Sequence, residues 1–443
     1  MDRREIYDAI VIGSGAAGGW AAKELTERGL RTMLLEAGRT LNPDIDFAPP
    51  AKRGASKIQL FSRAKAVLEG QHIQARCMSF SPQTGHLFVS DRENPYETPR
   101  GMPFNWYRSR HVGGRLHLWG RNALRISDHD LHPAGSDGFG QNWPIGYAEL
   151  APWYEKVESF LGVSGSPAGI PNIPDGLYDR PHPITAIEQK VLEELKIKWK
   201  GRPATTCRIV RHNPQRTPLP IIAALDTGLL TLRSDAVVSH INTDSDTGTA
   251  RSVIFIDRNS KQEHEVFGRA VVLCASTVES LRILLNSKSS RHPGGIGNSS
   301  GRLGHYLTDH VMTFQAAPAR RSKKASRQIR TISELNPEFT SPVSEILSQV
   351  ARRISCEGIR CSARLDGSSQ DGFSWPWARC SRVTKIVWRS RPVSWMPGAF
   401  LLSASHVAIR TTRKQWFGHA AVNVRTCARL RTTGRSSQAR GHP

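Results

Sequence analysis

The sequence predicts an α/β fold, and three observations indicate that class. Residues 7–12 form a short apolar stretch of strand type that runs directly into a glycine-rich turn and a helical pattern. A second apolar stretch, residues 31–35, follows the helix and ends at an acidic residue. A third, residues 270–275, again has the length of a buried strand. Strands that alternate with helices in this way are typical of a parallel sheet.

The turn after the first strand carries a glycine motif, residues 13–18, in which each glycine has a physical role. Gly13 permits the tight turn, Gly15 lets a pyrophosphate approach the backbone, and Gly18 lets the helix pack on the strand. The helix N-terminus stabilises phosphate charge, and Glu36 is placed to accept hydrogen bonds from ribose hydroxyls. We therefore predict dinucleotide binding. A glycine-rich helix start without a ligand is the alternative, and Glu36 argues against it; the motif alone does not decide between FAD and NAD.

Length and composition exclude several classes of protein. With 443 residues the chain is long enough for two or three domains. Its 7 cysteines, unevenly spaced, exclude a small disulfide-stapled protein and favour a reducing compartment. No window approaches the ~18 apolar residues of a membrane span, and no hydrophobic stretch of signal type follows the N-terminus. We expect a cytoplasmic protein without a membrane span.

The net charge of +23 is concentrated towards the C-terminus. Residues 321–443 hold 22 of the 61 Lys and Arg but 6 of the 38 Asp and Glu, which leaves a net charge of +7 for residues 1–320. After Asp371, 72 positions contain 13 Lys or Arg and no acid. A strong positive charge is typical of nucleic-acid-binding proteins, but here it belongs to one end of the chain.

That end, residues 320–443, also has an unusual composition. Five of the 11 Trp and four of the 7 Cys lie beyond residue 355, and hydrophobic periodicity fades. This composition is typical of GC-rich coding DNA translated in the wrong frame, so we expect an aberrant, disordered basic tail after a frameshift between about residues 312 and 330. A genuine nucleic-acid-binding extension is the alternative. Because no recognised binding motif accompanies the charge, we expect no nucleic-acid partner.

A second glycine-rich segment, residues 110–125, contains the pair Gly113 and Gly114 and a further glycine at position 120. A backbone without side chains suits close contact with a planar ligand. Basic and aromatic residues also favour a nucleic-acid interpretation, but the glycines favour a pocket wall. The basic and aromatic residues in question are Trp106, Tyr107, Arg108, Arg110, Arg115, Trp119 and Arg121.

These two segments together resemble the glucose–methanol–choline (GMC) family of FAD-dependent oxidoreductases. Residues 140–165 are similar to the sugar-oxidising bacterial branch of that family. Residues 232–238 resemble the family strand whose valine backbone meets the adenine, and residues 270–280 resemble the strand and turn that return to the flavin. Residues 295–310 resemble a glycine turn and a closing Asp-His pair. The resemblance extends over roughly 70% of the chain in several ordered motifs.

The resemblance implies a doubly wound, Rossmann-like FAD-binding domain built from residues 1–40, 105–125 and 225–310. It implies a second, α+β substrate domain with cap segments from residues 41–104 and 126–224, incomplete in this chain. The implied function is oxidation of CH–OH groups of sugars or alcohols by hydride transfer to flavin N5, with a small-molecule substrate; the electron acceptor and any partner subunit stay open. The residues expected to contact FAD are Gly13, Gly15, Ala16, Ala17, Gly18, Glu36, Ala37, Gly113, Gly114, Trp119, Gly120, Asn122, Ala123, Val238, Ala275 and Ser276.

One departure from the family concerns catalysis. Family members carry a catalytic His in a C-terminal segment, where it takes the hydroxyl proton; general base catalysis needs such a group within hydrogen-bond reach. His406, His419 and His442 do not lie in the family's sequence context. We therefore name no catalytic base, and a catalytically inactive FAD-binding fragment is the alternative function.

Further departures concern cofactors and metals. Leu118 stands where pyranose oxidases carry the His that holds FAD covalently, and His117 is one residue early. Because adjacent side chains diverge in direction, we expect non-covalent FAD. Only Cys207 lies where some relatives carry a cysteine-rich loop, so we expect no iron–sulfur cluster, and we expect Cys274 to be a core residue. We interpret residues 128–132 as a surface loop rather than a metal site.

Overall fold

The computed structural model describes most of residues 5–307 and only four short strands beyond them. Apart from those strands, the described residues do not include the predicted basic tail, its three histidines or the predicted Asp309-His310 pair. The frameshift and the disorder of the tail therefore stay predictions. The described residues are 5–47, 55–101, 103–132, 142–184, 186–198, 204–210, 218–305, 307, 311–312, 315–316, 373–374 and 377–378.

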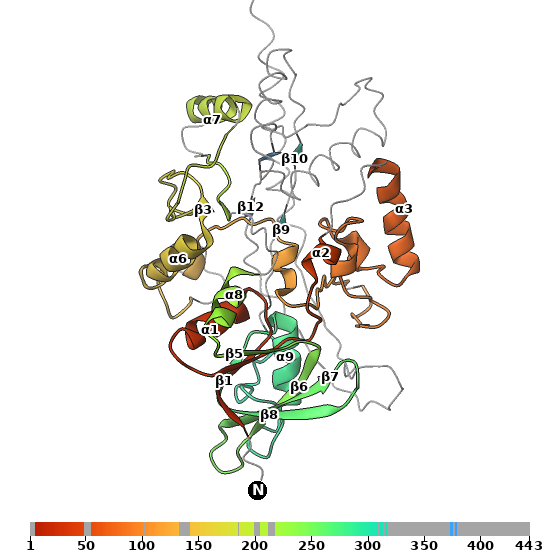
Figure 1. Ribbon diagram of the computed structural model, residues 1–443. Helices are drawn as coiled ribbons and strands as arrows, with labels where there is room; N and C mark the ends of the chain where they lie inside the picture. The colour runs from red at the N-terminus through yellow and green to blue at the C-terminus, as the bar shows by residue number, and fades with distance from the viewer. Residues whose placement is uncertain are drawn as a thin grey trace, which may run out of the picture.

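A six-stranded sheet with the order β5-β2-β1-β8-β7-β6 forms the base of the fold in Figure 1. The strands β5, β2, β1 and β8 run parallel, whereas β7 is antiparallel to β8 and β6 is antiparallel to β7. This parallel-dominated sheet confirms the predicted α/β class. The strands are β1 (Ile6–Ile12), β2 (Thr32–Leu35), β5 (Leu230–Arg233), β6 (Ala236–Thr243), β7 (Ala250–Asp257) and β8 (Glu263–Leu273).

Helices flank this sheet and also form two groups beyond it, with α2 and α3 on one side of the view and α6 and α7 on the other (Figure 1). The helices that flank the sheet are α1 (Ala16–Thr26), α8 (Leu219–Asp226) and α9 (Thr277–Asn286). The others are α2 (Pro43–Asp46), α3 (Ala55–Leu68), α4 (Asp128–Leu131), α6 (Tyr147–Leu161) and α7 (Ala186–Lys198), with the 3-10 helices η1 (Gln74–Arg76), η2 (Gly85–Leu87) and η3 (Gly114–His117).

The remaining strands are two residues long and form antiparallel pairs. The pairs are β3 (Val163–Ser164) with β4 (Ile209–Val210), β9 (Val311–Met312) with β12 (Trp377–Ala378), and β10 (Gln315–Ala316) with β11 (Phe373–Ser374).

The alternation of side chains along β1 explains why both faces of the sheet are covered. Ile10 points to the face where α9 packs through Ile283, and both side chains are almost fully buried. Val11 points to the opposite face, where it joins Ala22 of α1 and Ala224 of α8. Because successive residues of a strand face opposite sides, a continuous apolar run suits a strand covered on both faces. Helices on both faces agree with the doubly wound arrangement that the resemblance implied.

Two expectations about strands need correction. Residues 232–238 are not one strand: β5 ends at Arg233, Asp235 turns the chain with φ 56°, and β6 begins at Ala236. The end of β8 is only half-buried, and Cys274 next to it is half-buried rather than a core residue. It packs beside Val11 on the α1 face, and burial raises the pKa of its thiol.

The segments outside the sheet are tied to it by polar contacts. Lys156 of α6 donates to Glu24 of α1 at 2.7 Å. Within the cap segments, Arg125 and Glu158 form an ion pair at 2.5 Å with both side chains about 95% buried, at 4% and 5% exposure. The assignment of residues to two domains stays a prediction.

In the part of the chain that the structure describes, no helix combines the length and the apolar character needed to cross a bilayer.

Candidate functional site

The candidate site lies where β1, β2 and β8 end, at the glycine turn after β1. Gly13 has a φ of 95°, which favours glycine. A Cβ placed on Gly13 would lie 2.6 Å from the carbonyl oxygen of Cys274, so the turn presses directly against the end of β8. Gly18 permits the next close contact, because a Cβ there would lie 1.7 Å from the carbonyl oxygen of Gly13. The packing roles predicted for these two glycines are confirmed.

Gly15, between them, faces open space. A Cβ on Gly15 would meet nothing within 4 Å, although its φ of −67° is open to any residue. Gly15 is the N-cap of α1, and Ala16 and Ala17 in the first turn are exposed. That first turn contains no acidic residue and no side-chain cap. Unpaired backbone amides at a helix N-terminus favour an anion, so this open cradle fits the pyrophosphate of a dinucleotide.

Glu36 lies at the end of β2 and is 7% exposed. One carboxylate oxygen accepts from the amide of Ser14 at 3.0 Å and from its hydroxyl at 2.5 Å, and the other accepts from the amide of Gly38 at 2.9 Å. Burial raises the pKa of the Glu36 carboxyl, although these hydrogen bonds favour its charged form. The acid is therefore held rigidly beside the glycine turn, and its contact with ribose hydroxyls stays a prediction.

Ser14 also brings the second glycine segment to this turn, a role that the sequence analysis missed. Its hydroxyl accepts from the amide of Gly113 at 3.0 Å, across 99 residues of sequence. A Cβ placed on Gly114 would lie 3.7 Å from the Cα of Gly15. The two glycine segments thus form adjacent walls of one site. A hydroxyl-bearing residue inside the first motif was the only signal in the sequence for this contact.

The other predicted FAD-contacting residues lie at varying distances from this centre. Ala275 follows Cys274 and abuts Gly13, and Ser276 is the exposed N-cap of α9 with an unusual φ of 68°. Ala37 follows Glu36 and is half-buried. Val238 lies in β6, two residues after Ala236, whose amide donates to the carbonyl of Glu36 at 2.8 Å. Each of these positions stays a prediction as a cofactor contact.

The later part of the second glycine segment turns towards the cap segments. Asn122 forms an isolated antiparallel β-bridge with Ile209, and the amide of Ala123 donates to the carbonyl of Arg208 at 2.9 Å. Trp119 is 36% exposed, and Gly120 follows it as a half-buried residue. These four predicted contacts lie farther along the segment than Gly113 and Gly114, and they also stay predictions.

The two residues considered for covalent attachment are half-buried. Leu118 packs with Phe80 and Phe88 in a hydrophobic cluster. A ring nitrogen of His117 lies 3.0 Å from the carbonyl oxygen of Val112. Non-covalent FAD stays the expectation for this chain.

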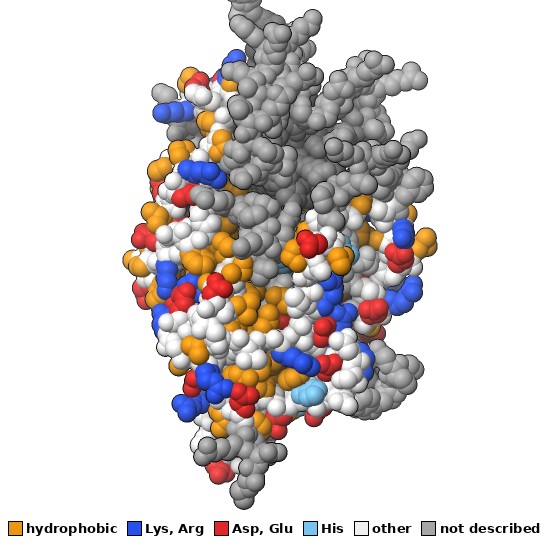
Figure 2. All heavy atoms as spheres, in the orientation of Figure 1, with side chains coloured by type: hydrophobic (Ala, Val, Ile, Leu, Met, Phe, Trp, Pro, Cys, Tyr) orange, Lys and Arg blue, Asp and Glu red, His pale blue; other side chains and the backbone are white. Residues whose placement is uncertain are grey.

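Two of the basic residues considered for nucleic acid have partners within the protein, and the absence of a nucleic-acid partner stays an expectation. Arg108 is 5% exposed and lies against the rings of Trp106 and Tyr96, and burial lowers its pKa to about 10. Arg110 forms an ion pair with Glu279. Figure 2 shows side chains of both charges interspersed on the visible face, with hydrophobic side chains gathered near its middle.

Residues 128–131 form a single helical turn, α4, rather than the expected loop. Ser127 and Asp130 cap the helix reciprocally, and Asp128 accepts from the amide of Tyr147 at 2.7 Å. These carboxylates stabilise helix N-termini, which explains their clustering without a metal ion.

Comparison with known proteins is consistent with a dinucleotide site. The chain matches the family described as FAD binding domain over residues 8–298. It is 28% identical to paromamine 6'-oxidase of Streptomyces fradiae over 69% of this chain and 54% of that protein. It is 26% identical to 2-methyl-1,2-propanediol dehydrogenase of Mycolicibacterium austroafricanum, over 71% of this chain and 57% of that protein. It is 25% identical to the fructose dehydrogenase large subunit of Gluconobacter japonicus, over 70% of this chain and 60% of that protein. The chain spans a little over half the length of these relatives.

Proposed function

Because this chain belongs to the FAD binding domain family, we propose that it is an FAD-dependent oxidoreductase that acts on CH–OH groups of sugars or alcohols. The family match confirms the predicted cofactor, FAD. The relatives are named as an oxidase and two dehydrogenases, which supports the oxidoreductase hypothesis over the alternative of an inactive FAD-binding fragment.

The observation that carries the proposal is the open cradle at Gly15, enclosed by Glu36 and the pair Gly113 and Gly114. The amides of the first turn of α1 would bind the pyrophosphate. A carboxylate offers about four lone-pair sites, and Ser14 and Gly38 use three of them. Glu36 would accept from a ribose hydroxyl through the site that is left, on the oxygen bonded to Gly38. The glycine pair would let the backbone lie close to a planar ring.

The substrate class is also a proposal. Two of the relatives are named for 2-methyl-1,2-propanediol and for fructose, and both compounds carry CH–OH groups. Bound FAD supplies an acceptor for the hydride of such a group. The base that would remove the hydroxyl proton is not assigned to any residue of the described part of the chain.

Anaerobic mixing of the purified flavoprotein with candidate substrates tests the proposal. The panel contains fructose, 2-methyl-1,2-propanediol and simple primary alcohols. We expect at least one of them to bleach the absorbance of oxidised flavin. tert-Butanol is the matched control, because its carbinol carbon carries no hydrogen and it cannot lose hydride.

Three outcomes would contradict different parts of the proposal. Bound flavin that no member of the panel bleaches would favour the inactive fragment. Equal bleaching by tert-butanol would show that hydride transfer is not being measured. Saturable binding of NAD without uptake of FAD would overturn the cofactor.

A further inference from the structure

An ion-pair relay lies beside the FAD site and connects three segments of the chain. Glu279, in the first turn of α9, accepts from Arg110 at 2.7 Å through one carboxylate oxygen and from Arg282 at 2.8 Å through the other. The three side chains are between 12% and 16% exposed. We refer to Arg110, Glu279 and Arg282 as the relay.

One end of the relay holds the strand predicted to meet the adenine. A terminal nitrogen of Arg282 donates to the carbonyl of Val238 at 2.7 Å. Arg282 belongs to α9, so its hydrogen bond to Val238 connects β6 to α9, and the same guanidinium group also holds Glu279 within the helix. Because that group is planar and rigid, it fixes the distance between its partners better than a flexible ammonium would.

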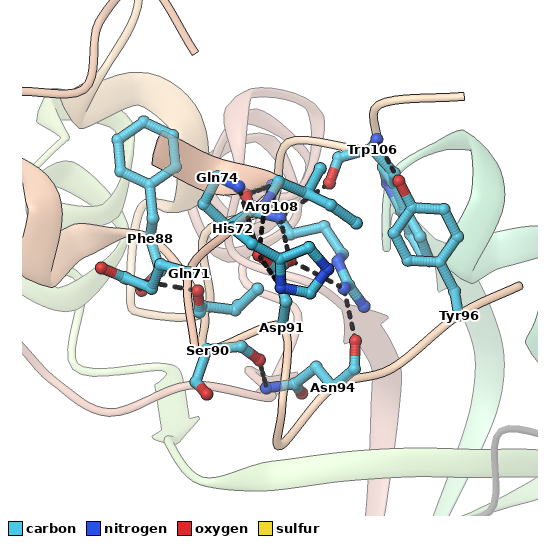
Figure 3. Close-up of polar contacts among 12 residues, drawn as sticks. Gln71, His72, Gln74, Phe88, Ser90, Asp91, Asn94, Tyr96, Trp106 and Arg108 are labelled. Atoms are coloured by element: carbon cyan, nitrogen blue, oxygen red, sulfur yellow. Dashed lines mark hydrogen bonds and ion pairs between the residues drawn. The ribbon is translucent and has the colours of Figure 1, made fainter. Parts of the chain in front are cut away.

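The other end is anchored in a buried polar cluster, shown in Figure 3. Arg110 donates to the side-chain oxygen of Asn94 at 2.6 Å. Asn94 is itself held by Ser90, whose carbonyl accepts from its side chain at 3.0 Å, and by Arg108, which donates to its backbone carbonyl. Asp91, 3% exposed, completes this anchor by accepting from the side chain of Gln74 at 2.7 Å.

The backbone of Arg110 also packs tightly against the end of β2. A Cβ placed on Gly38 would lie 1.9 Å from the carbonyl carbon of Arg110. Arg110 therefore cannot shift without moving the chain next to Glu36. Burial disfavours ionisation of Glu279, but the charges of Arg110 and Arg282 outweigh it and lower the pKa of Glu279 to about 2. Glu279 is thus ionised at neutral pH.

The relay residues stand next to three segments of the predicted cofactor site. Arg110 precedes Gly113 by three residues, Glu279 follows Ser276 by three residues, and Arg282 contacts Val238 directly. We propose that Glu279 is a positioning residue for FAD, which acts through both arginines to hold these three segments in register. The inference depends on the FAD site and not on the substrate that is oxidised.

Titration of the flavin-free full-length chain with FAD tests this inference, with flavin fluorescence as the signal. The variants are Glu279→Gln, which removes the central charge, and Arg282→Lys, which keeps the charge but loses the shared guanidinium. We expect both to bind FAD roughly tenfold more weakly or worse, because hydrogen bonds to charged groups are lost. We also expect the visible circular dichroism of the bound flavin to change, which a loss of stability alone would not produce.

Matched variants separate positioning from a general loss of charge. Glu194→Gln removes one partner of an exposed ion pair with Lys198 on α7 and should leave the dissociation constant for FAD unchanged. Glu279→Asp keeps the charge and should restore part of the affinity. Titrations are made well below the melting temperature of each variant, so that unfolded protein does not contribute.

Unchanged affinity and unchanged flavin spectra in Arg282→Lys and Glu279→Gln would overturn the inference. If Glu279→Gln does not fold, Arg282→Lys alone decides in the same way. Failure of the unaltered chain to bind FAD would also overturn the assignment of FAD as the cofactor. If the unaltered chain binds FAD and the variants bind it with the same affinity, only the role of the relay is overturned.

Discussion

Replacing Gly15 by valine tests whether the open space at the start of α1 belongs to FAD. The φ of Gly15 is −67°, and a Cβ there would meet nothing within 4 Å. The folded chain therefore has room for the new side chain. Glycine is a better N-cap than a β-branched residue, so we expect Gly15→Val to cost about 1 kcal/mol of unfolding free energy.

The effect on FAD should be much larger, because the valine methyl groups would occupy the path by which the pyrophosphate approaches the backbone. A ligand at 100 times its dissociation constant stabilises the folded state by about 2.7 kcal/mol. For a folded unit of about 300 residues, with an unfolding entropy of about 2.1 cal/mol/K per residue, that corresponds to a rise in melting temperature of roughly 4 °C. We expect the unaltered chain to show this rise on addition of FAD and the Gly15→Val variant to show none.

The assay is a thermal melt with and without FAD, together with the flavin content after purification. Gly146→Val is the matched control, because Gly146 is also a glycine N-cap, of α6, with φ −101° and a Cβ position 3.7 Å from Asp128. It should retain the FAD-dependent rise. A normal rise and normal flavin content in Gly15→Val would refute the location of the cofactor.

Three other predictions concern stability. Gly18→Ala should destabilise the fold by roughly 2 kcal/mol or more even without FAD, because its Cβ would lie 1.7 Å from a carbonyl oxygen; a urea midpoint equal to that of the unaltered chain would contradict this. The hydrogen bond and charge of Lys156 lower the pKa of Glu24 to about 2. The contribution of Glu24 to the free energy of unfolding is therefore complete above its unfolded pKa of ~4.3 and is lost as the pH falls towards 2. In the Glu24→Gln variant the free energy of unfolding should therefore depend less steeply on pH in that window. Glu158→Gln leaves the buried Arg125 charge uncompensated and should cost about 3–5 kcal/mol in denaturant unfolding; a loss below 1 kcal/mol would argue against a buried pair, since that is the range of exposed ones.

Much of the cofactor site could be predicted from the sequence because it is local. The turn between β1 and α1 depends on residues that are neighbours in the chain. Gly13, for example, adopts a backbone conformation that favours glycine, so a single position in the sequence indicates the turn. The same holds for the apolar run of β1, whose pattern reports burial on both faces. The second glycine segment was recognised through a resemblance that joins many short motifs in order.

Other features depend on packing between segments that are far apart in the chain. Ser14 contacts Gly113 across 99 residues, and Arg110 contacts Glu279 across 169. In the sequence, Arg110 or Glu279 alone is compatible with an exposed surface, with a charged patch or with a buried ion pair. Only the fold brings the two residues together. The sequence by itself determined the dinucleotide turn, because backbone sterics act over a few residues. The tertiary structure decided which distant side chains hold that turn in place, because hydrogen bonds and ion pairs depend on distances in space that the order of residues does not specify.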